Sequence, residues 1–554
     1  MIRVVMAQCA FPVGDMSGNA RRIAAAALAA RDDHAADMVV FPELALTGYP
    51  PDDLLYRSDV MAQVDTAVAD LRTAVPGITL VFGAPRKVEE RLFNAAFAIR
   101  DGRVLGVYHK CHLPNRGVFD ERRYFERDDT PLLFELNGVR VGLTICEDLW
   151  HPGPYERAVA AGAGLVVNIN ASPYHRGKVF EREAVIRERQ QHGAVPVVYV
   201  NPVGGQDEVV YDGVSCVLDA QGQVAARAPA FVERLLPVDL AINADNTFSV
   251  RRGMIAELPD DDALTYSALV VGTRDYVRRH GFPGVVLGLS GGIDSAMTAA
   301  IAVDALGADQ VHGVMLASRY TSQESHDDAE ACARLLGIRY SRLSIESMFS
   351  AARETLSPLF VGRDDDVTEE NMQSRCRGLL LMALSNKFGT MVLTTGNKSE
   401  YAVGYATLYG DMCGGFAPLK DVYKTVLYRL ARWRNARQAV MPERVLLKAP
   451  TAELRADQKD EDSLPSYPTL DRILDAYVDQ DQSASALLAA GEDPAVVSQV
   501  LTLLHRNEYK RRQSAPGVKV TRKAFGRERR YPIMSGFQPL SAPIQAVNMS
   551  RGRK

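Results

Sequence analysis

Short apolar runs separated by polar turns recur through the first half of the chain. Their length and their β-branched content favour buried strands. These runs span residues 4–7, 38–41, 80–83, 95–99, 104–108, 139–145, 165–169 and 197–200. Residues 19–31 and 60–74 have apolar positions at helical spacing, and Asp101-Gly102 and Gln221-Gly222 are hairpin turn signals. Alternating strands and helices predict an α/β layer fold.

A second series of apolar runs follows further along the chain. Strands are predicted at residues 285–289, 311–316, 341–345 and 391–394, with helices at 296–306 and 327–336. Strand, helix and strand in succession predict a doubly wound parallel sheet, Rossmann-like, which binds ligands at the carboxyl ends of its strands. Between the two series the chain is rich in Asn, Asp and Pro and has no sustained period. We therefore predict domains at residues 1–245 and 265–554, joined by a linker at 246–264.

Composition narrows the class of protein. A chain of 554 residues is too long for one core, and its net charge of −4 argues against a nucleic-acid binder. The seven cysteines are scattered and include no Cys-x-x-Cys pair, which argues against a disulfide framework or a zinc site. No apolar run is long enough to cross a bilayer, and the N-terminus lacks the pattern of a signal peptide. We expect a cytoplasmic protein with neither a membrane nor a nucleic-acid partner.

Three predicted strands of the first half end in residues with useful chemistry. Glu43 closes a Phe-Pro-Glu turn, Lys110 lies in Tyr-His-Lys, and Cys146 lies in Ile-Cys-Glu-Asp. Beside a lysine, the pKa of a cysteine is expected to fall, while a glutamate can act as a base and a lysine can stabilise an oxyanion. Taken singly, each has a simpler interpretation: a strand-end cysteine is usually a small buried hydrophobe, and a Glu or Lys there is usually solvated.

The order of these three motifs resembles the nitrilase, or carbon–nitrogen hydrolase, superfamily over about residues 1–240. The resemblance implies a four-layer α-β-β-α sandwich and a catalytic triad of Glu43, Lys110 and Cys146, in which the cysteine forms a thioester. A degenerate, non-catalytic copy is the alternative. The resemblance further implies that glutamine is bound by Glu121, Ser172 and Lys178. Arg116 stands where many glutamine-using relatives have a tyrosine.

The stretch at residues 285–295 ends in Ser-Gly-Gly-Ile-Asp-Ser and runs directly into a helical pattern. Glycines let a ligand approach the main chain, and the N–H groups at the start of the helix favour an anion. Asp294 is placed to hold Mg²⁺ on the same phosphates. The common nucleotide loop has a lysine here, but no lysine lies between Gly284 and Asp309. The stretch resembles the loop of the ATP pyrophosphatases; a glycine-rich turn without a ligand is the alternative.

From about residue 264 onward the chain resembles the NAD synthetases within that group. The matches include the loop, the Tyr-Gly-Asp turn and Pro-Thr-Ala-Glu-Leu, and Leu408 stands where some relatives have a substrate-contacting lysine. The resemblance implies three sets of contacts: ATP at Ser290, Gly291, Gly292, Ile293, Asp294, Ser295, Thr395, Lys424 and Thr451; Mg²⁺ at Asp294 and Glu400; and deamido-NAD at Asn371, Arg375, Glu400 and Lys510.

Three polar stretches of the second half have more than one interpretation. The acidic run at residues 364–370 suits a helix start, where it caps and is solvated. Residues 458–462 are consistent with a mobile lid or with an ordinary surface loop. The basic tail at residues 507–530 suits either nucleic acid or the phosphates of a dinucleotide, and the modest total charge favours the second.

The pairing of the two halves resembles the glutamine-dependent NAD synthetases. This resemblance implies that glutamine hydrolysis supplies neutral ammonia, through a closed path, to a deamido-NAD that ATP and Mg²⁺ have adenylated, in a homo-oligomer. Two alternatives remain. A GMP- or asparagine-type amidotransferase shares the loop but pairs it with a different glutaminase fold. A nitrilase-like scaffold carrying a nucleotide sensor would need no triad.

Overall fold

The computed structural model describes residues 1–244, 247–455, 458, 460–537 and 539–540. The chain divides into two compact units, one ending at Tyr276 and the other beginning at Val277. The stretch predicted as a linker, residues 246–264, contains strand β15 (Phe248–Val250) and the start of helix α5 (Asp261–Arg279). The predicted domain boundaries stay a prediction.

The first unit contains two large β-sheets and a small one. The seven-stranded sheet has the order β15-β14-β1-β2-β3-β4-β5, the six-stranded sheet has the order β13-β12-β9-β8-β7-β6, and β10 and β11 form a pair. The strands are β1 Ile2–Gln8, β2 Met38–Val40, β3 Thr79–Val88, β4 Arg91–Arg100, β5 Arg103–His109, β6 Leu133–Leu136, β7 Val139–Ile145, β8 Leu165–Ile169, β9 Val197–Val200, β10 Val203–Gln206, β11 Val209–Asp212, β12 Cys216–Leu218, β13 Val224–Arg227 and β14 Arg234–Ile242.

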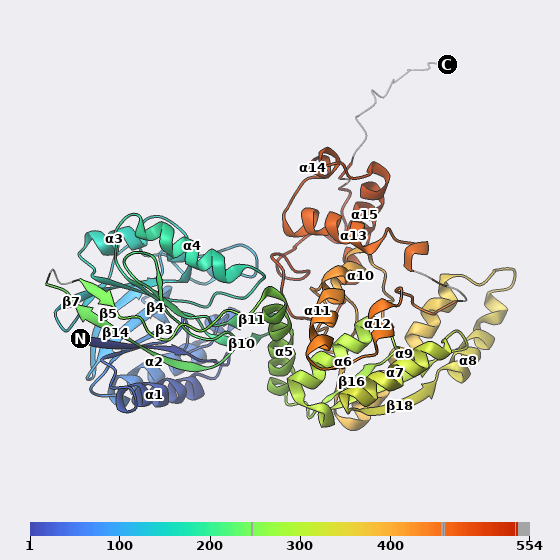
Figure 1. Cartoon of the computed structure of the whole chain (residues 1–554), viewed down its shortest axis with the longest axis horizontal. Coiled ribbons are helices and arrows are strands. Elements are labelled where there is room, and N and C mark those ends of the chain that lie inside the picture. The colour runs from blue at the N-terminus through green and yellow to red at the C-terminus, as the bar shows by residue number, and fades with distance from the viewer. Residues whose placement is uncertain (245–246, 456–457, 459, 538, 541–554) are drawn as a thin grey trace, which may run out of the picture. The chain divides into compact units, whose positions relative to one another are not determined.

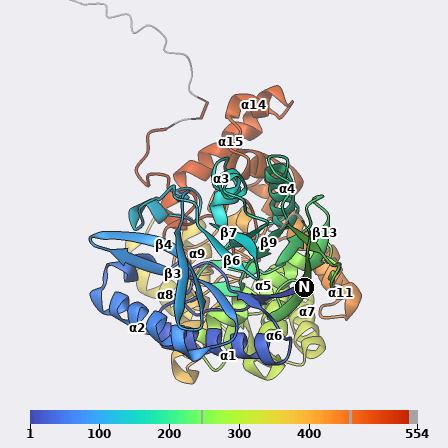
Figure 2. The same ribbon diagram turned by 90° about the vertical axis from the view of Figure 1, so that its left-hand side faces the viewer.

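The two large sheets face one another across a shared apolar core. Alternate residues of a strand point to opposite faces, so Val4 and Met6 of β1 join the core between the sheets, where they meet Val141 and Val167. The outer faces are covered by helices α1 (Met16–Asp32) and α2 (Ser58–Ala74) on one side and by α3 (Pro154–Ala160) and α4 (Lys178–Gln190) on the other. Figures 1 and 2 show these helix pairs on opposite sides of the strands. The predicted four-layer sandwich is confirmed.

Strand pairing brings the three predicted reactive residues to strand ends. β2 is parallel to β1 and β3, and β7 is parallel to β8. β5 runs antiparallel to β4, and Asp101-Gly102 forms the two-residue turn between them with positive φ at both positions, as the hairpin signal predicted. Glu43 follows β2, Lys110 follows β5 and Cys146 follows β7 directly. Strands β6 and β10–β15 have short or mixed apolar patterns, and these patterns did not predict them.

The second unit is built on a parallel sheet of order β18-β17-β16-β19. Its strands are β16 Val285–Gly288, β17 Val311–Ala317, β18 Arg339–Ser344 and β19 Met391–Leu393. Helix α9 (Val367–Phe388) packs on the face that carries Val286 and Val314, and α6 (Ile293–Leu306) and α7 (Gln323–Leu336) also contact the strands. Asp366 caps α9 by accepting from the Thr368 N–H, which confirms the capping interpretation for that residue. The predicted parallel sheet is likewise confirmed.

The second unit contains further helices besides α9. They are α6 Ile293–Leu306, α7 Gln323–Leu336, α8 Glu346–Leu356, α10 Lys398–Val403, α11 Lys424–Arg437, α12 Glu443–Leu447, α13 Tyr467–Leu474, α14 Ala484–Ala489, α15 Pro494–Arg506 and α16 Glu508–Arg511. Residues of α10, α13, α14 and α15 contribute to one further apolar cluster. Figure 1 shows these helices in the same part of the second unit.

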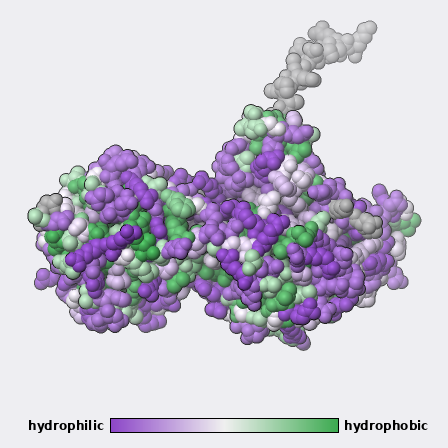
Figure 3. Space-filling model, in the orientation of Figure 1, coloured by the Kyte–Doolittle hydropathy of each residue, from purple (hydrophilic) through white to green (hydrophobic). Residues whose placement is uncertain are grey.

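The surface in Figure 3 is mainly polar, with apolar residues in scattered patches. None of the helices in the described part of the chain has the length and hydropathy that a bilayer crossing requires. In the basic tail, Arg511 and Arg529 are buried and pair with Glu508. These two guanidinium groups are therefore held inside the second unit and are not presented to a partner.

Candidate functional site

In the first unit, the ammonium of Lys110 lies between two buried carboxylates. Its Nζ is 2.7 Å from Glu43 Oε1 and 2.7 Å from Glu121 Oε1, and Lys110 and Glu43 have no exposed side-chain surface. The side-chain amide of Asn94 donates to Glu43 Oε1 at 2.6 Å and to Glu121 Oε2 at 3.4 Å, and the backbone carbonyl of Asn94 accepts from the backbone N–H of Lys110. Asn94 therefore links both carboxylates by its side chain and holds the main chain at the lysine.

Burial and the neighbouring charges in this cluster shift the pKa values of Glu121 and Lys110. Burial, together with the charge of Glu43, raises the pKa of Glu121 to about 7, although Lys110 opposes this shift. Burial opposes the charge of Lys110 as well, but the attraction of Glu121 and Glu43 outweighs it and the pKa of Lys110 lies well above its usual value. Lys110 is therefore a permanent cation at neutral pH.

Cys146 begins a 3-10 turn, η3 (Cys146–Leu149), directly after β7. Its φ of +43° lies in the left-handed region, where a residue with a side chain is strained and where active-site residues cluster. Burial and the charge of Glu43 raise the pKa of the Cys146 thiol well above its usual value, despite Lys110. The expected lowering of this pKa is thus wrong, because burial outweighs the ammonium, and the resting residue is a thiol that needs a base.

Asp148 joins the strand end that bears Cys146 to the one that bears Lys110. Its Oδ2 accepts from the Ile145 N–H at 3.0 Å and from the Tyr108 hydroxyl at 2.9 Å. Its Oδ1 accepts from the N–H groups of Cys111 and His112 at 3.1 and 2.8 Å. Because this carboxyl is buried, its pKa is raised to about 6.

In the second unit, the Ser-Gly-Gly-Ile-Asp-Ser loop joins β16 to α6. Gly291 has φ of +82°, and a Cβ there would lie 2.4 Å from the carbonyl oxygen of Ser325, so no other residue fits. The hydroxyls of Ser290 and Ser295 are 3.1 Å apart, and Ser295 donates to the Gly292 carbonyl at 2.9 Å. The loop is therefore closed upon itself at the N-terminus of a fourteen-residue helix, a place that favours phosphate.

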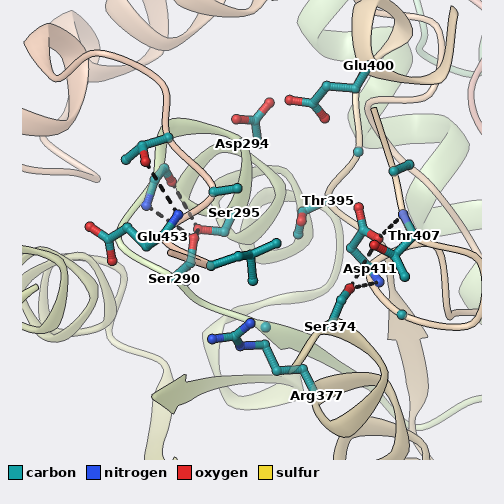
Figure 4. A pocket seen from close by; sticks show the side chains of 18 of the residues that line it. Ser290, Asp294, Ser295, Ser374, Arg377, Thr395, Glu400, Thr407, Asp411 and Glu453 are labelled. Atoms are coloured by element: carbon teal, nitrogen blue, oxygen red, sulfur yellow. Dashed lines mark hydrogen bonds between the residues drawn. The ribbon is translucent and has the colours of Figure 1, made fainter. Parts of the chain in front are cut away.

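A cavity of about 440 Å³ opens beside this loop. Figure 4 shows the side chains of Ser290, Ser295, Asp294 and Glu400 gathered around it. The lining includes every residue predicted to contact ATP, namely Ser290, Gly291, Gly292, Ile293, Asp294, Ser295, Thr395, Lys424 and Thr451. Such a volume is within the range of small-molecule sites.

Asp294 and Glu400 share the ammonium of Lys424. Its Nζ lies 2.5 Å from Asp294 Oδ2 and 3.1 Å from Glu400 Oε1, and Asn397 donates to the other oxygen of Asp294 at 2.7 Å. Burial, with the like charges of Asp294 and Asp460, raises the pKa of Glu400 to about 8, against the effect of Lys424.

This donor set fits Mg²⁺ on a nucleotide. Two neighbouring carboxylates whose mutual repulsion raises a pKa would gain from a divalent cation, and Mg²⁺ usually takes one or two carboxylates plus phosphate oxygens and water. Within the described residues no group of three or more His, Cys, Asp or Glu side chains is arranged to hold a metal. Phosphate and water would therefore have to supply the remaining ligands.

Comparison with known proteins assigns both units. The family models for carbon-nitrogen hydrolase and NAD synthase match residues 3–244 and 265–514. The glutamine-dependent NAD(+) synthetase of Xylella fastidiosa (strain Temecula1) is 50% identical over 541 residues, covering 97% of this chain and 99% of its own. The chain belongs to the glutamine-dependent NAD(+) synthetase family. A further member, from Thermotoga maritima, is 43% identical over 572 residues and covers 97% of this chain and 99% of its own.

Solved structures agree with this membership. The glutamine-dependent NAD+ synthetase of Acinetobacter baumannii, determined in complex with ADP, is 44% identical with a TM-score of 0.79, covering 96% of this chain and 98% of its own. The synthetase of Cytophaga hutchinsonii, at 23% identity and a TM-score of 0.83, covers 97% of this chain and 98% of its own and shows the same fold.

Ser172 and Lys178, which are predicted to contact glutamine, each have a polar or aromatic neighbour in the first unit. Ser172 Oγ accepts from the Arg182 guanidinium at 3.2 Å. Lys178 Nζ lies 3.8 Å from the centre of the Trp150 ring, and burial lowers the pKa of Lys178 to about 8. The side chain of Arg116 is 74% exposed and lies 3.2 Å from Glu147, the neighbour of Cys146. Arg116 therefore stands near the nucleophile, at the solvent.

Of the residues predicted to bind deamido-NAD, Asn371, Glu400 and Lys510 line the cavity. Asn371 Oδ1 accepts from the Thr407 hydroxyl at 2.8 Å. Lys510 donates to the carbonyls of Gly404 and Ala406 at 2.9 and 2.8 Å.

Arg375 is described by the structure but lies outside the cavity lining; it donates to the Leu408 carbonyl at 3.2 Å. Leu408 itself packs against the apolar cluster of the C-terminal helices. The predicted contact of Arg375 with the dinucleotide stays a prediction.

Several residues of these sites were not singled out from the sequence. Asp148 was visible in the Ile-Cys-Glu-Asp motif, but Asn94 lies inside a strand and gave no signal. In the cavity, Arg377 donates to the Leu316 carbonyl, and burial lowers its pKa to about 10. Glu453 lay within a quoted motif, and Asp460 lay within the stretch at 458–462 that we interpreted as a lid or a loop.

That stretch is only partly described. Lys459 lies outside the described residues. Gln458 accepts at its carbonyl from the Thr451 hydroxyl at 2.5 Å, and Asp460 accepts from the Tyr467 hydroxyl at 2.8 Å and lines the cavity. The choice between a lid and a loop stays open.

Proposed function

We propose that the first unit hydrolyses glutamine at Cys146 and that the second unit uses ATP to amidate deamido-NAD to NAD with the ammonia released. The observation that carries this proposal is the buried Glu43–Lys110–Glu121 cluster beside a strained cysteine at the end of β7. A merely structural lysine would not need two buried carboxylates and a left-handed cysteine in one place.

The charges of Glu43 and Lys110 suit the attack of Cys146 on the amide of glutamine. Glu43 takes the proton of the Cys146 thiol, because the thiol is protonated at rest and the charge of Glu43 reaches it. The sulfur attacks the side-chain amide carbon of glutamine, and Lys110 stabilises the negative charge that forms on the carbonyl oxygen. Ammonia leaves with a proton returned from Glu43, and water, activated by the same carboxylate, hydrolyses the thioester to glutamate.

Binding of the rest of glutamine is assigned to the polar groups around this centre. We assign Glu121, Ser172 and Lys178 to the contacts with glutamine. Glu121 adjoins Lys110, and the effect of Cys146 on the pKa of Lys178 supports a position of that ammonium near the nucleophile. Lys178 is the residue best suited to the carboxylate of glutamine.

In the second unit the loop at residues 290–295 would hold the phosphates of ATP, with Thr395, Lys424 and Thr451 around them. Asp294 and Glu400 would hold Mg²⁺, which supplies charge neutralisation of the phosphates when bound. Asn371, Arg375, Glu400 and Lys510 would orient deamido-NAD so that its nicotinate carboxylate meets the α-phosphorus. Ammonia then displaces AMP from the adenylated carboxylate.

The deciding experiment replaces the nucleophile. Cys146→Ala should abolish NAD formation from glutamine while leaving NAD formation from ammonium chloride at high pH within about twofold of the parent, since the second unit is untouched. AMP and NAD are measured together in both assays. Loss of both activities in a folded protein would contradict the proposed division of labour.

The proposal also covers the location, assembly and partners of this enzyme. We expect a cytoplasmic homo-oligomer that acts on small molecules and binds neither nucleic acid nor a membrane. Light scattering of the purified protein at several concentrations tests the assembly; a mass equal to one chain throughout would contradict it.

A further inference from the structure

The phosphate loop of the second unit lacks a cation of its own. No lysine lies between Gly284 and Asp309, and Lys424 is already bound by Asp294 and Glu400. A triphosphate carries several negative charges, and the bond to its α-phosphorus breaks more readily when the departing charge is neutralised. A second cation from another part of the chain would add to the charge that Lys424 and Mg²⁺ bring to the phosphates.

Lys448 lies in the right place for this role. It follows α12 directly and lines the cavity, and its Nζ is 2.7 Å from the hydroxyl of Ser325. The backbone of Ser325 lies against the loop, because its carbonyl oxygen is the atom that a Cβ on Gly291 would meet. The ammonium is thus one residue away from the phosphate loop, and its side chain is 21% exposed.

A neighbouring carboxylate holds this ammonium in position. Glu453 Oε1 is 3.3 Å from Lys448 Nζ and also accepts from the hydroxyls of Ser322 and Ser325 at 2.9 and 2.7 Å. Burial opposes the charge of Glu453, but these hydrogen bonds and Lys448 outweigh it and lower its pKa. A lysine supported on one side by an ionised carboxylate and a hydroxyl keeps further N–H donors for an anion in the cavity.

We propose that Lys448 binds the β- and γ-phosphates of ATP and stabilises pyrophosphate as the leaving group. This inference rests on the proposed function of the second unit. In the step concerned, a carboxylate oxygen of deamido-NAD forms a bond to the α-phosphorus. The bond from that phosphorus to the oxygen bridging to the β-phosphorus breaks, and its electron pair stays on pyrophosphate, next to the ammonium. No proton or electron is exchanged with another molecule.

The test compares ligands with and without the two outer phosphates. In Lys448→Gln we expect affinity for ATP and for magnesium pyrophosphate to fall about 10- to 100-fold, the usual effect of one charged hydrogen bond. Affinity for AMP should change by less than about twofold, because AMP lacks those phosphates. Calorimetry on the whole enzyme gives all three constants. Lys448→Arg, which keeps the charge, should recover part of the loss.

The matched control is Arg444→Gln. Arg444, on the helix α12 that Lys448 follows, pairs with Asp328 of α7 at 2.8 Å and lies outside the cavity lining, so its loss should lower the melting temperature and leave all three affinities unchanged. Two results would overturn the role of Lys448: unchanged pyrophosphate affinity in Lys448→Gln, or an equal loss for AMP and ATP. If the parent enzyme itself bound no ATP, the proposed function would fail instead.

Discussion

Each unit of this protein holds a lysine between two carboxylates, but the two clusters have different access to solvent. Lys110 and Glu43 of the first unit have no exposed side-chain surface. In the second unit Lys424 is 2% exposed, while the side chains of Asp294 and Glu400 are 20% and 17% exposed and line a cavity. The enclosed cluster suits a fixed charge pattern around a nucleophile. The open cluster suits ion exchange, in which a metal and phosphates enter between the lysine and the carboxylates.

The largest expected effect comes from removing either lysine. Lys110→Met should lower glutamine hydrolysis on the order of 10³-fold or more, since the oxyanion loses its cation and two buried carboxyls lose their partner. Stability should fall by about 3 kcal/mol for the same reason. Synthesis of NAD from ammonia should persist. Glutamate release, NAD formation and urea unfolding are measured on one preparation.

Lys424→Met is the reciprocal change. It should preserve basal glutamate release and lower ammonia-dependent synthesis on the order of 10²-fold or more, because ATP loses a predicted contact. If each variant lost both activities to the same extent, the two clusters would not be separate centres.

The next effect concerns pH and separates the open cluster from the enclosed one. Glu400, with a pKa of about 8, must lose its proton before it can bind Mg²⁺. Apparent Mg²⁺ affinity in the ammonia reaction should therefore rise up to about tenfold per pH unit between about pH 6 and 8, and then level off. Glu400→Gln should remove this slope. A flat profile in the parent protein would contradict the assignment.

The same proton affects folding in the opposite direction. The folded chain keeps it between the ordinary pKa of 4.5 and about 8, where the unfolded chain has released it. The contribution of Glu400 to stability should thus decline as the pH rises through this window. Urea unfolding of the parent and of Glu400→Gln across that range isolates this contribution.

A smaller effect is expected at Asn94, which joins the two carboxylates of the enclosed cluster. Asn94→Ala removes hydrogen bonds to Glu43 and Glu121, so kcat for glutamine hydrolysis should fall about 10- to 100-fold with little change in KM. Ammonia-dependent synthesis serves as the control. A purely structural role would instead lower the melting temperature and leave kcat of the folded fraction intact.

The smallest effect is expected at the solvent edge of the first unit. Arg116→Tyr introduces the tyrosine that the family resemblance leads us to expect at this position. Because Arg116 is 74% exposed and its pairing with Glu147 is screened by water, KM for glutamine should change by less than about fivefold and kcat should stay constant. Steady-state kinetics at two salt concentrations check this expectation, and a large change in kcat would place Arg116 in the reaction itself.

The local pattern of apolar residues predicted much of the fold and where many of its strands end. Apolar runs predicted β1–β5, β7–β9 and β16–β19, because buried strands need continuous or alternating apolar residues. It did not predict short strands such as β10–β13, whose pairing depends on partners distant in the chain. Asn94 was missed for a related reason. An asparagine within a strand gives no sign of its role in the sequence, because that role depends on Glu43 and Glu121, which other parts of the chain bring next to it.

By itself, the sequence determined the two α/β halves, the order of Glu43, Lys110 and Cys146, and the glycine loop with its aspartate, because turns and strand ends are encoded by neighbouring residues. Only the tertiary structure decided the protonation of Cys146 and the raised pKa of Glu121 and Glu400, and only it brought Lys448 beside the phosphate loop. Burial and the distance between charges set these properties, and both arise from contacts between residues far apart in the chain.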